Sequence, residues 1–163
     1  MFVCTLPSFT FLRISNLVPY MLANIVSDNS YFFKHSDVSF SMSGVVLRVY
    51  RTKTIQFNQR ALEIPLPLIP NSVLCPVSAL QTLLSNVPAP LSAPLFIVQS
   101  GNCFKPILAH HFNRFLKSCA HATGFSAHQL SSRSFRQGGA TFAFNCRAPT
   151  EFIKAHGDWQ SDA

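Results

Sequence analysis

The hydrophobic pattern of the chain first takes a period of two, between positions 37 and 66. Apolar and polar residues alternate at 38–40, and the run VVLRVY at 45–50 is rich in β-branched and aromatic residues. Ser43-Gly44, between these two runs, predicts a tight turn. A third extended run at 61–66 ends in a cluster of prolines. We therefore expect three short strands in one antiparallel sheet.

After the prolines the hydrophobic period becomes helical. Val77, Leu80, Leu83 and Leu84 share one face of a helix that begins at Pro76. A proline-rich linker at 88–94 and a short apolar run at 95–98 follow. A second helix is expected at about 106–122, and its apolar face comprises Leu108, Phe112, Phe115, Leu116 and Cys119.

Two more helices are expected, at about 132–146 and from Pro149 onward, and a short helical turn at 14–17 precedes the sheet. The predicted fold class is α+β and mostly helical, a small three-stranded antiparallel sheet followed by a helical bundle. A length of 163 residues and a hydrophobic fraction of 48% fit one domain over 1–163 with a real core.

The apolar N-terminus does not have the pattern of a signal peptide or a membrane span. It has no basic region before the apolar stretch, and Pro7 and Arg13 interrupt it. We expect an intracellular protein without a membrane partner. The odd number of cysteines, without a CxxC or Cys/His metal spacing, predicts neither a disulfide framework nor a zinc site. We expect the five cysteines to be buried free thiols: Cys4, Cys75, Cys103, Cys119 and Cys146. We expect no metal or cofactor in this protein.

Charge narrows the choice of partner. Charged residues make up only 12% of the chain, yet 13 Lys and Arg stand against 6 Asp and Glu, a formal charge of +7. This excess favours a polyanionic partner, with nucleic acid ahead of a membrane surface. The alternative is an interaction domain whose charge is incidental.

Five side chains are candidates for function. They are Arg13 in FLRISNLVP, Lys53 in RTKTIQF, Arg133 and Arg136 in SSRSFRQGGATFAFNC, and Trp159 in HGDWQSDA. Each also has an ordinary structural interpretation: a snorkelling or ion-paired arginine, a solvated loop lysine, a core aromatic. The pair at 138–139 is interpreted as close helix packing or helix entry, since no phosphate-loop pattern surrounds it.

The segment SFRQGGATFAF, followed by IKAHGDWQSDA, resembles the catalytic domain of tyrosine recombinases, the phage-integrase superfamily. More narrowly, it resembles the DIRS-like and Crypton-like recombinases of eukaryotic mobile elements. That family orders its residues as arginine, hairpin lysine, His-x-x-Arg, His or Trp, and tyrosine. The first four positions occur here in that order, and the resemblance covers nearly the whole chain.

The resemblance implies roles for these residues and a partner, double-stranded DNA. Arg13 and Arg136 would clamp a phosphate without a metal, because a planar guanidinium donates two parallel hydrogen bonds. Lys53 would protonate the leaving 5′ oxygen, and the indole N–H of Trp159 would donate to the phosphate. The residue count from Arg136 favours Trp159 at this position over its neighbours His156 and Asp158. Relatives act as tetramers on paired DNA sites, so the resemblance implies a homo-oligomer on paired DNA sites for a full-length form. A DNA partner also implies a nuclear setting.

Three departures from the family pattern predict a chain that is catalytically incompetent as written. Arg133 stands where the family has histidine, and arginine cannot accept a proton at neutral pH. This position has either lost its catalytic role through mutational decay, or Arg133 serves as a third phosphate-binding cation. Tyr20, Tyr31 and Tyr50 all lie far upstream of the position of the nucleophile, so we expect a C-terminally truncated catalytic core. Finally, no core-binding domain precedes Arg13. A repurposed DNA-binding module without chemistry is the alternative.

Overall fold

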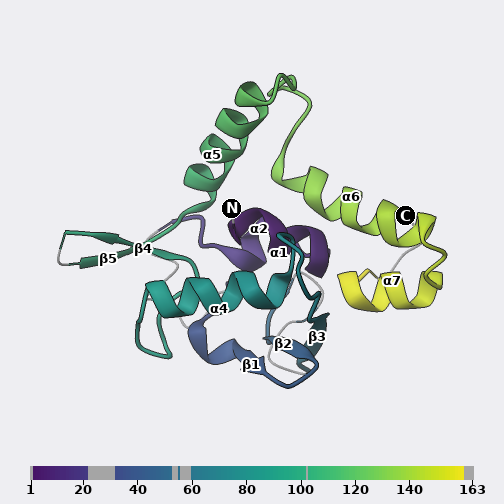
Figure 1. Ribbon diagram of the computed structural model, residues 1–163, viewed down its shortest axis with the longest axis horizontal. Coiled ribbons are helices and arrows are strands. Elements are labelled where there is room, and N and C mark those ends of the chain that lie inside the picture. Colours follow the sequence, from purple (N-terminus) through teal and green to yellow (C-terminus); the bar gives the residue numbers. More distant parts are fainter. Residues whose placement is uncertain (1, 22–31, 53–54, 56–59, 102, 160–163) are drawn as a thin grey trace.

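A computed structural model of the chain describes residues 2–21, 32–52, 55, 60–101 and 103–159, and in the first helix only the side chains from Leu6 onward. Figure 1 shows the sheet and the helices packed on it, with two long helices extending away from them. The elements in chain order are α1 (Phe2–Thr10), α2 (Ile14–Leu17), the 3-10 turn η1 (His35–Asp37), β1 (Val38–Phe40), β2 (Gly44–Val49), β3 (Leu62–Pro67), α4 (Pro76–Asn86), β4 (Ile97–Ser100), β5 (Cys103–Pro106), α5 (Ala109–Ala122), α6 (Ser132–Asn145) and α7 (Thr150–Gly157).

The predicted three-stranded antiparallel sheet is confirmed, with strand order β1-β2-β3. Its buried face follows from strand alternation: Val45 lies opposite Leu66, and Leu47 opposite Ile64. The turn before β2 requires glycine, because a Cβ on Gly44 would lie 2.3 Å from a carbonyl oxygen of β3. The third strand begins and ends one residue later than the sequence predicts.

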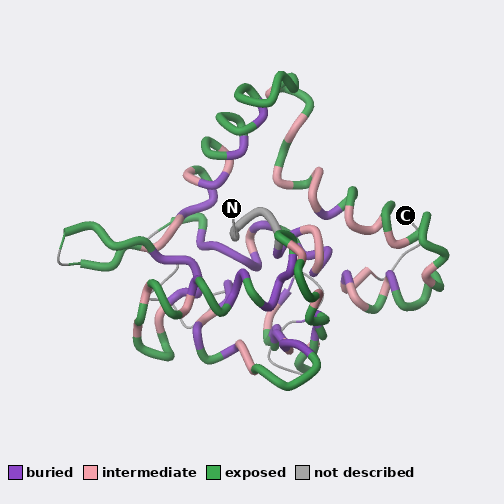
Figure 2. The backbone as a smooth tube through the Cα atoms, in the orientation of Figure 1, coloured by how far each residue is buried: buried purple, intermediate pink, exposed green. Residues whose placement is uncertain are grey.

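The hydrophobic core joins the sheet to α1, α2 and α4. Its largest fully buried side chains include Phe33, Phe96 and Phe112, which come from three separate segments. Figure 2 shows the buried backbone concentrated in this central region, whereas the β4–β5 hairpin and most of α6 and α7 are exposed or half-buried. Helix α1 packs against both α4 and α6, so the N-terminal helix connects the core to the C-terminal helices.

The four helices predicted after the sheet are confirmed as α4, α5, α6 and α7, and the predicted helical turn is α2. The predicted apolar face of α5 is too wide. Ala109, Phe112, Leu116 and Ala120 are buried, but Phe115 and Cys119 are exposed. Neighbouring elements cover only one side of this helix, so the outer part of the apolar face stays in solvent.

Four elements were not expected from the sequence: α1, the short turn η1 and the strands β4 and β5. Helix α1 lies in the apolar N-terminal stretch, and the region around the apolar run at 95–98 forms the β4–β5 hairpin. Pro106 pairs with Ile97 in that hairpin, which is why α5 begins three residues later than predicted.

The expectation of buried thiols is wrong for most of the cysteines. Cys75 is buried, but Cys103, Cys119 and Cys146 are exposed because they lie in the hairpin, on the outer side of α5 and just after α6. Among the described residues, no helix has the length and apolar character needed to span a membrane.

Candidate functional site

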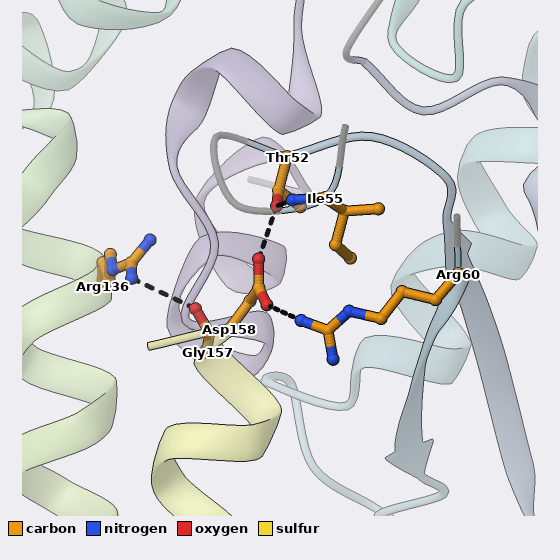
Figure 3. A network of polar contacts seen from close by, with 6 residues as sticks. All are labelled: Thr52, Ile55, Arg60, Arg136, Gly157 and Asp158. Atoms are coloured by element: carbon orange, nitrogen blue, oxygen red, sulfur yellow. Dashed lines mark hydrogen bonds and ion pairs between the residues drawn. The ribbon is translucent and has the colours of Figure 1, made fainter. Parts of the chain in front are cut away.

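Arg136 is the centre of the candidate site and the buried residue of helix α6, with an exposed fraction of 9%. Its Nη2 atom donates a hydrogen bond to the carbonyl oxygen of Gly157, at 3.1 Å. Its guanidinium carbon lies 4.5 Å from the ring centroid of Trp159, a cation–π contact. The close-up in Figure 3 shows the Arg136 side chain directed from α6 toward the end of α7. Two helices therefore fix this cation.

The charge of Arg136 is held in an unfavourable environment. Burial lowers the pKa of its guanidinium to about 10, the positive charge of Arg13 acts in the same direction, and Asp158 opposes them. Arg136 still carries its proton at neutral pH. The site therefore concentrates positive charge where solvent stabilises it poorly, and such a site favours an anion.

Arg13 supplies the second positive charge of the site. It immediately precedes α2 in extended backbone conformation, and its carbonyl oxygen accepts a hydrogen bond from the N–H of Asn16. The Asn16 side chain in turn donates to the carbonyl oxygen of Arg51, at 3.2 Å, which ties α2 to the segment after β2. Arg13 itself is exposed. The structure thus brings Arg13, exposed to solvent, within electrostatic range of the buried Arg136, although 122 positions separate them in the sequence.

An aromatic stack supports the other face of the site. Trp159 lies parallel to Phe11, with ring centroids 6.3 Å apart and an interplanar angle of 18°. His156 meets Phe11 edge-on, at 4.9 Å, and its Nε2 donates to the carbonyl oxygen of Phe9. Gly157 makes room for the indole, because a Cβ there would lie 2.9 Å from a Trp159 ring atom. The junction between α1 and α2 thereby holds the indole that contacts Arg136.

The prediction for Lys53 lies outside the described residues, but residues close to it in sequence are described. The hydroxyl of Thr52 donates to Oδ2 of Asp158, at 2.5 Å, and accepts a hydrogen bond from the N–H of Ile55, at 3.0 Å. Nη2 of Arg60 lies 2.8 Å from the other oxygen, Oδ1, of Asp158. Figure 3 shows these contacts converging on the end of α7. Thr52 and Arg60, two described residues of the β2–β3 connection, are therefore tied to the end of α7, next to the carbonyl that accepts the Arg136 hydrogen bond.

Arg133 lies in the first turn of α6, one turn before Arg136, and is exposed. Among the described tyrosines, Tyr20 and Tyr50 are both exposed, and Tyr31 lies outside the described part of the chain. Within that described part, no group of three or more His, Cys, Asp or Glu side chains could hold a metal ion.

Sequence reasoning missed Phe11 and ranked two further residues of the site, His156 and Asp158, below Trp159. Asp158 was passed over in favour of Trp159, yet its carboxylate makes the contacts to the β2–β3 connection. The sequence signal that could have indicated Asp158 was its position in HGDW, at the end of a predicted helix. Its left-handed backbone (φ 52°, ψ 47°) ends α7 and allows the next residue to turn back toward Arg136. No sequence pattern indicated Phe11, whose backbone is also left-handed (φ 52°).

Comparison with known proteins supports the fold. A scan against protein-family models finds no match, and a search of curated proteins finds none. Among solved structures, the chain is similar to the XerH site-specific recombinase, solved bound to its difH substrate as a pre-cleavage complex. The TM-score is 0.65 at 12% sequence identity; the match covers 98% of this chain and 39% of that chain. The chain thus has the α+β fold of a tyrosine recombinase, as the resemblance predicted, and spans well under half the length of that protein.

Proposed function

We propose that this chain binds double-stranded DNA through a backbone phosphate held by Arg136 and Arg13. The observation that carries the proposal is the buried Arg136 guanidinium, fixed from two sides and placed within electrostatic range of a second arginine. In the part of the chain that the structure describes, no carboxylate oxygen lies within ion-pair distance of this guanidinium. A phosphate diester offers the missing negative charge and the paired acceptors that two guanidinium groups require.

The surface of α5 supports a polyanionic partner independently. Four basic or titratable side chains, His110, Arg114, Lys117 and His121, follow one another at spacings of four, three and four residues, and all are exposed. At about 100° per residue, these positions fall on one narrow stripe of the helix. The stripe runs for roughly 16 Å, which is long enough to contact several phosphates of a duplex.

The reaction for which we propose this site is phosphodiester strand exchange of the tyrosine-recombinase type, as in the DIRS-like and Crypton-like recombinases. In that reaction Lys53 would serve the leaving oxygen, and Arg133 would add a third cation near the phosphate. Cleavage would require a tyrosine on the C-terminal side of Trp159, whereas all three tyrosines of the chain precede Arg136. We therefore expect these 163 residues to bind DNA without forming a covalent adduct.

Fluorescence anisotropy with a labelled duplex tests the proposal. With three phosphate contacts, the association constant should fall roughly 40-fold between about 50 and about 200 mM salt. Arg136→Ala should weaken binding and reduce the slope of log K against log salt by about one. Lys105→Ala removes one exposed charge from the β4–β5 hairpin, at the opposite end of the view in Figure 1 from α6 and α7. This control should bind nearly as the wild type does.

Two results would contradict the proposal. Absence of DNA binding at low salt would favour the alternative, an interaction domain whose charge is incidental. Equal losses in the Arg136 and Lys105 variants would mean that binding depends on overall charge and not on this site. A covalent adduct on a nicked duplex would contradict the expectation of binding without cleavage.

A further inference from the structure

Phe11 is held in a backbone conformation that its own side chain makes costly. Its φ of 52° lies in the left-handed region, which bulky residues rarely adopt because the Cβ approaches a backbone carbonyl oxygen. Buried contacts on both sides prevent the chain from relaxing. The Thr10 hydroxyl donates to the carbonyl oxygen of Leu6, at 2.8 Å, and accepts a hydrogen bond from the N–H of Leu12, at 3.4 Å. Strained residues that are fixed in this way cluster at functional sites.

The ring of Phe11 packs against both α6 and the end of α7. It lies parallel to the Trp159 indole, with centroids 6.3 Å apart, and His156 meets it edge-on at 4.9 Å. On α6, a Cβ added to Gly139 would lie 2.8 Å from a carbon of this ring. The same indole lies 4.5 Å from the guanidinium carbon of Arg136. The Phe11 ring therefore supports the aromatic contact of Arg136.

The backbone of Phe11 directs the chain toward Arg13. Helix α1 ends at Thr10, and Arg13 precedes α2 in extended conformation, with φ −75° and ψ 150°. The left-handed residue between these two elements is therefore where the chain leaves the first helix. It brings Arg13, which is exposed, within electrostatic range of Arg136. One residue thus connects the two cations, Arg13 through its backbone and Arg136 through its ring.

We propose that Phe11 is a positioning residue for DNA binding, which fixes the guanidinium groups of Arg13 and Arg136 relative to each other. The inference rests on the proposed function, because its readout is the contact with a DNA phosphate. Phe11 does not touch the phosphate in this account. Guanidinium groups bind a phosphate through directed hydrogen bonds, so a shift of one relative to the other costs a contact.

Glycine and alanine at position 11 separate positioning from simple stability. Both substitutions remove the ring, but only glycine accepts the left-handed backbone without strain. Phe11→Gly should therefore unfold at a higher temperature than Phe11→Ala. Positioning predicts that the glycine variant nevertheless binds DNA no more tightly than the alanine variant, because glycine also frees the backbone that leads to Arg13. A purely structural role predicts that affinity follows the order of the Tm values.

The salt dependence of binding measures the loss of a phosphate contact. One such contact is worth about eightfold in the association constant at about 0.1 M salt, and we expect Phe11→Gly to lose about this factor. The fall in the association constant between about 50 and about 200 mM salt should shrink from roughly 40-fold to roughly 12-fold. Lower stability alone reduces the fraction of folded protein and leaves the salt slope unchanged.

Two further variants complete the experiment. Phe11→Leu keeps most of the apolar volume, so it tests the proposal even if the two smaller residues prevent folding. Leucine has no flat face for the indole, and we expect this variant also to bind more weakly than the wild type. Phe142→Ala is the matched control. It removes a phenylalanine ring that is 70% exposed on α6, and it should leave both affinity and salt slope unchanged.

The emission of Trp159, the single tryptophan of the chain, tests the ring contact without DNA. In Phe11→Gly the indole loses the ring that lies parallel to it, so water reaches it more freely. Its emission maximum should therefore shift to longer wavelength. An unchanged maximum would mean that Phe11 does not hold the indole, and would overturn the inference.

The binding outcomes separate this inference from the proposed function. If the wild type binds DNA with the expected salt dependence and Phe11→Gly and Phe11→Leu keep its affinity and slope, the positioning role is wrong and the proposed function stands. Affinities that follow the Tm values at an unchanged slope would also overturn the inference. If the wild type does not bind, the proposed function is wrong and the inference falls with it.

Discussion

Replacing Arg136 by methionine should make the protein more stable and remove its affinity for phosphate. Methionine fills a similar volume on an unbranched stem but has no charge. The lowered pKa of Arg136, about 10 against an ordinary value of 12.5, corresponds to an unfavourable free energy on the order of 3 kcal/mol for the charged form in the fold. Because Arg136 is protonated in both the folded and unfolded states at every pH well below 10, this cost is fully present at neutral pH.

Two favourable contacts of Arg136 offset part of that cost. The hydrogen bond to the Gly157 carbonyl contributes about 1 kcal/mol, and the contact with the Trp159 ring about 1 kcal/mol more. The net expectation for Arg136→Met is a gain of about 1 kcal/mol in the free energy of unfolding. For a chain of this length, that gain corresponds to a rise in Tm of about 2–4 °C.

Thermal unfolding of the wild type and Arg136→Met, with and without phosphate, measures both effects. An anion at ten times its dissociation constant adds about 1.4 kcal/mol to the stability of a protein that binds it only when folded. The Tm of the wild type should therefore rise with phosphate concentration by roughly 3–6 °C at that level. The Tm of Arg136→Met should not respond. Arg136→Lys, which keeps the charge but not the planar fork, should respond weakly.

A purely structural role for Arg136 predicts a different change in the free energy of unfolding. If Arg136 stabilises the fold, its removal leaves the buried Gly157 carbonyl without its donor, at a cost of about 1–3 kcal/mol, and removes the contact with the Trp159 ring as well. A loss of more than about 2 kcal/mol in Arg136→Met, together with a wild-type Tm that ignores phosphate, would refute the interpretation of Arg136 as a cation held ready for an anion.

Three further predictions follow from the same contacts. If Trp159 acts through its ring face on Arg136, Trp159→Phe should keep most of the DNA affinity and Trp159→Ala should lose it, whereas equal losses would favour donation by the indole N–H. Replacing Arg114 and Lys117 on α5 by alanine should lower the slope of log K against log salt by about two in anisotropy titrations, and an unchanged slope would remove α5 from the DNA contact. Gly139→Ala should destabilise the fold by about 2 kcal/mol or more in chemical denaturation, because the added Cβ would lie 2.1 Å from a carbonyl oxygen of α1; a neutral effect would mean that α1 and α6 pack less closely.

Most of the fold could be predicted from hydrophobic periodicity. The sheet follows from the alternation at 38–66, and α4 from its proline start and apolar face. Helix α1 was missed because Pro7 lies inside it, and a proline within a stretch usually breaks a helix. The β4–β5 hairpin was missed because its strands have only four residues each, and the first begins inside an apolar run.

The candidate site could be predicted only in part. The order of the basic residues along the sequence pointed to Arg13 and Arg136, which the structure brings within electrostatic range of each other. The interpretation of the pair at 138–139 as close helix packing is confirmed for Gly139. The contacts of Asp158 could not be predicted, because they join positions more than 90 residues apart in the sequence through side chains. Contacts between such distant positions leave no pattern in the sequence around either residue.

The central claim is that Arg13 and Arg136 hold one phosphate beside Trp159, and the fluorescence of Trp159 tests it most directly. Trp159 is the single tryptophan of the chain and contacts the Arg136 guanidinium. Titration with a short unlabelled duplex should produce a saturable change in its emission, which Arg13→Ala weakens and Arg136→Ala abolishes. Emission that does not change while the duplex binds, or that changes equally in both variants and the wild type, would place the DNA elsewhere on the protein and contradict the account.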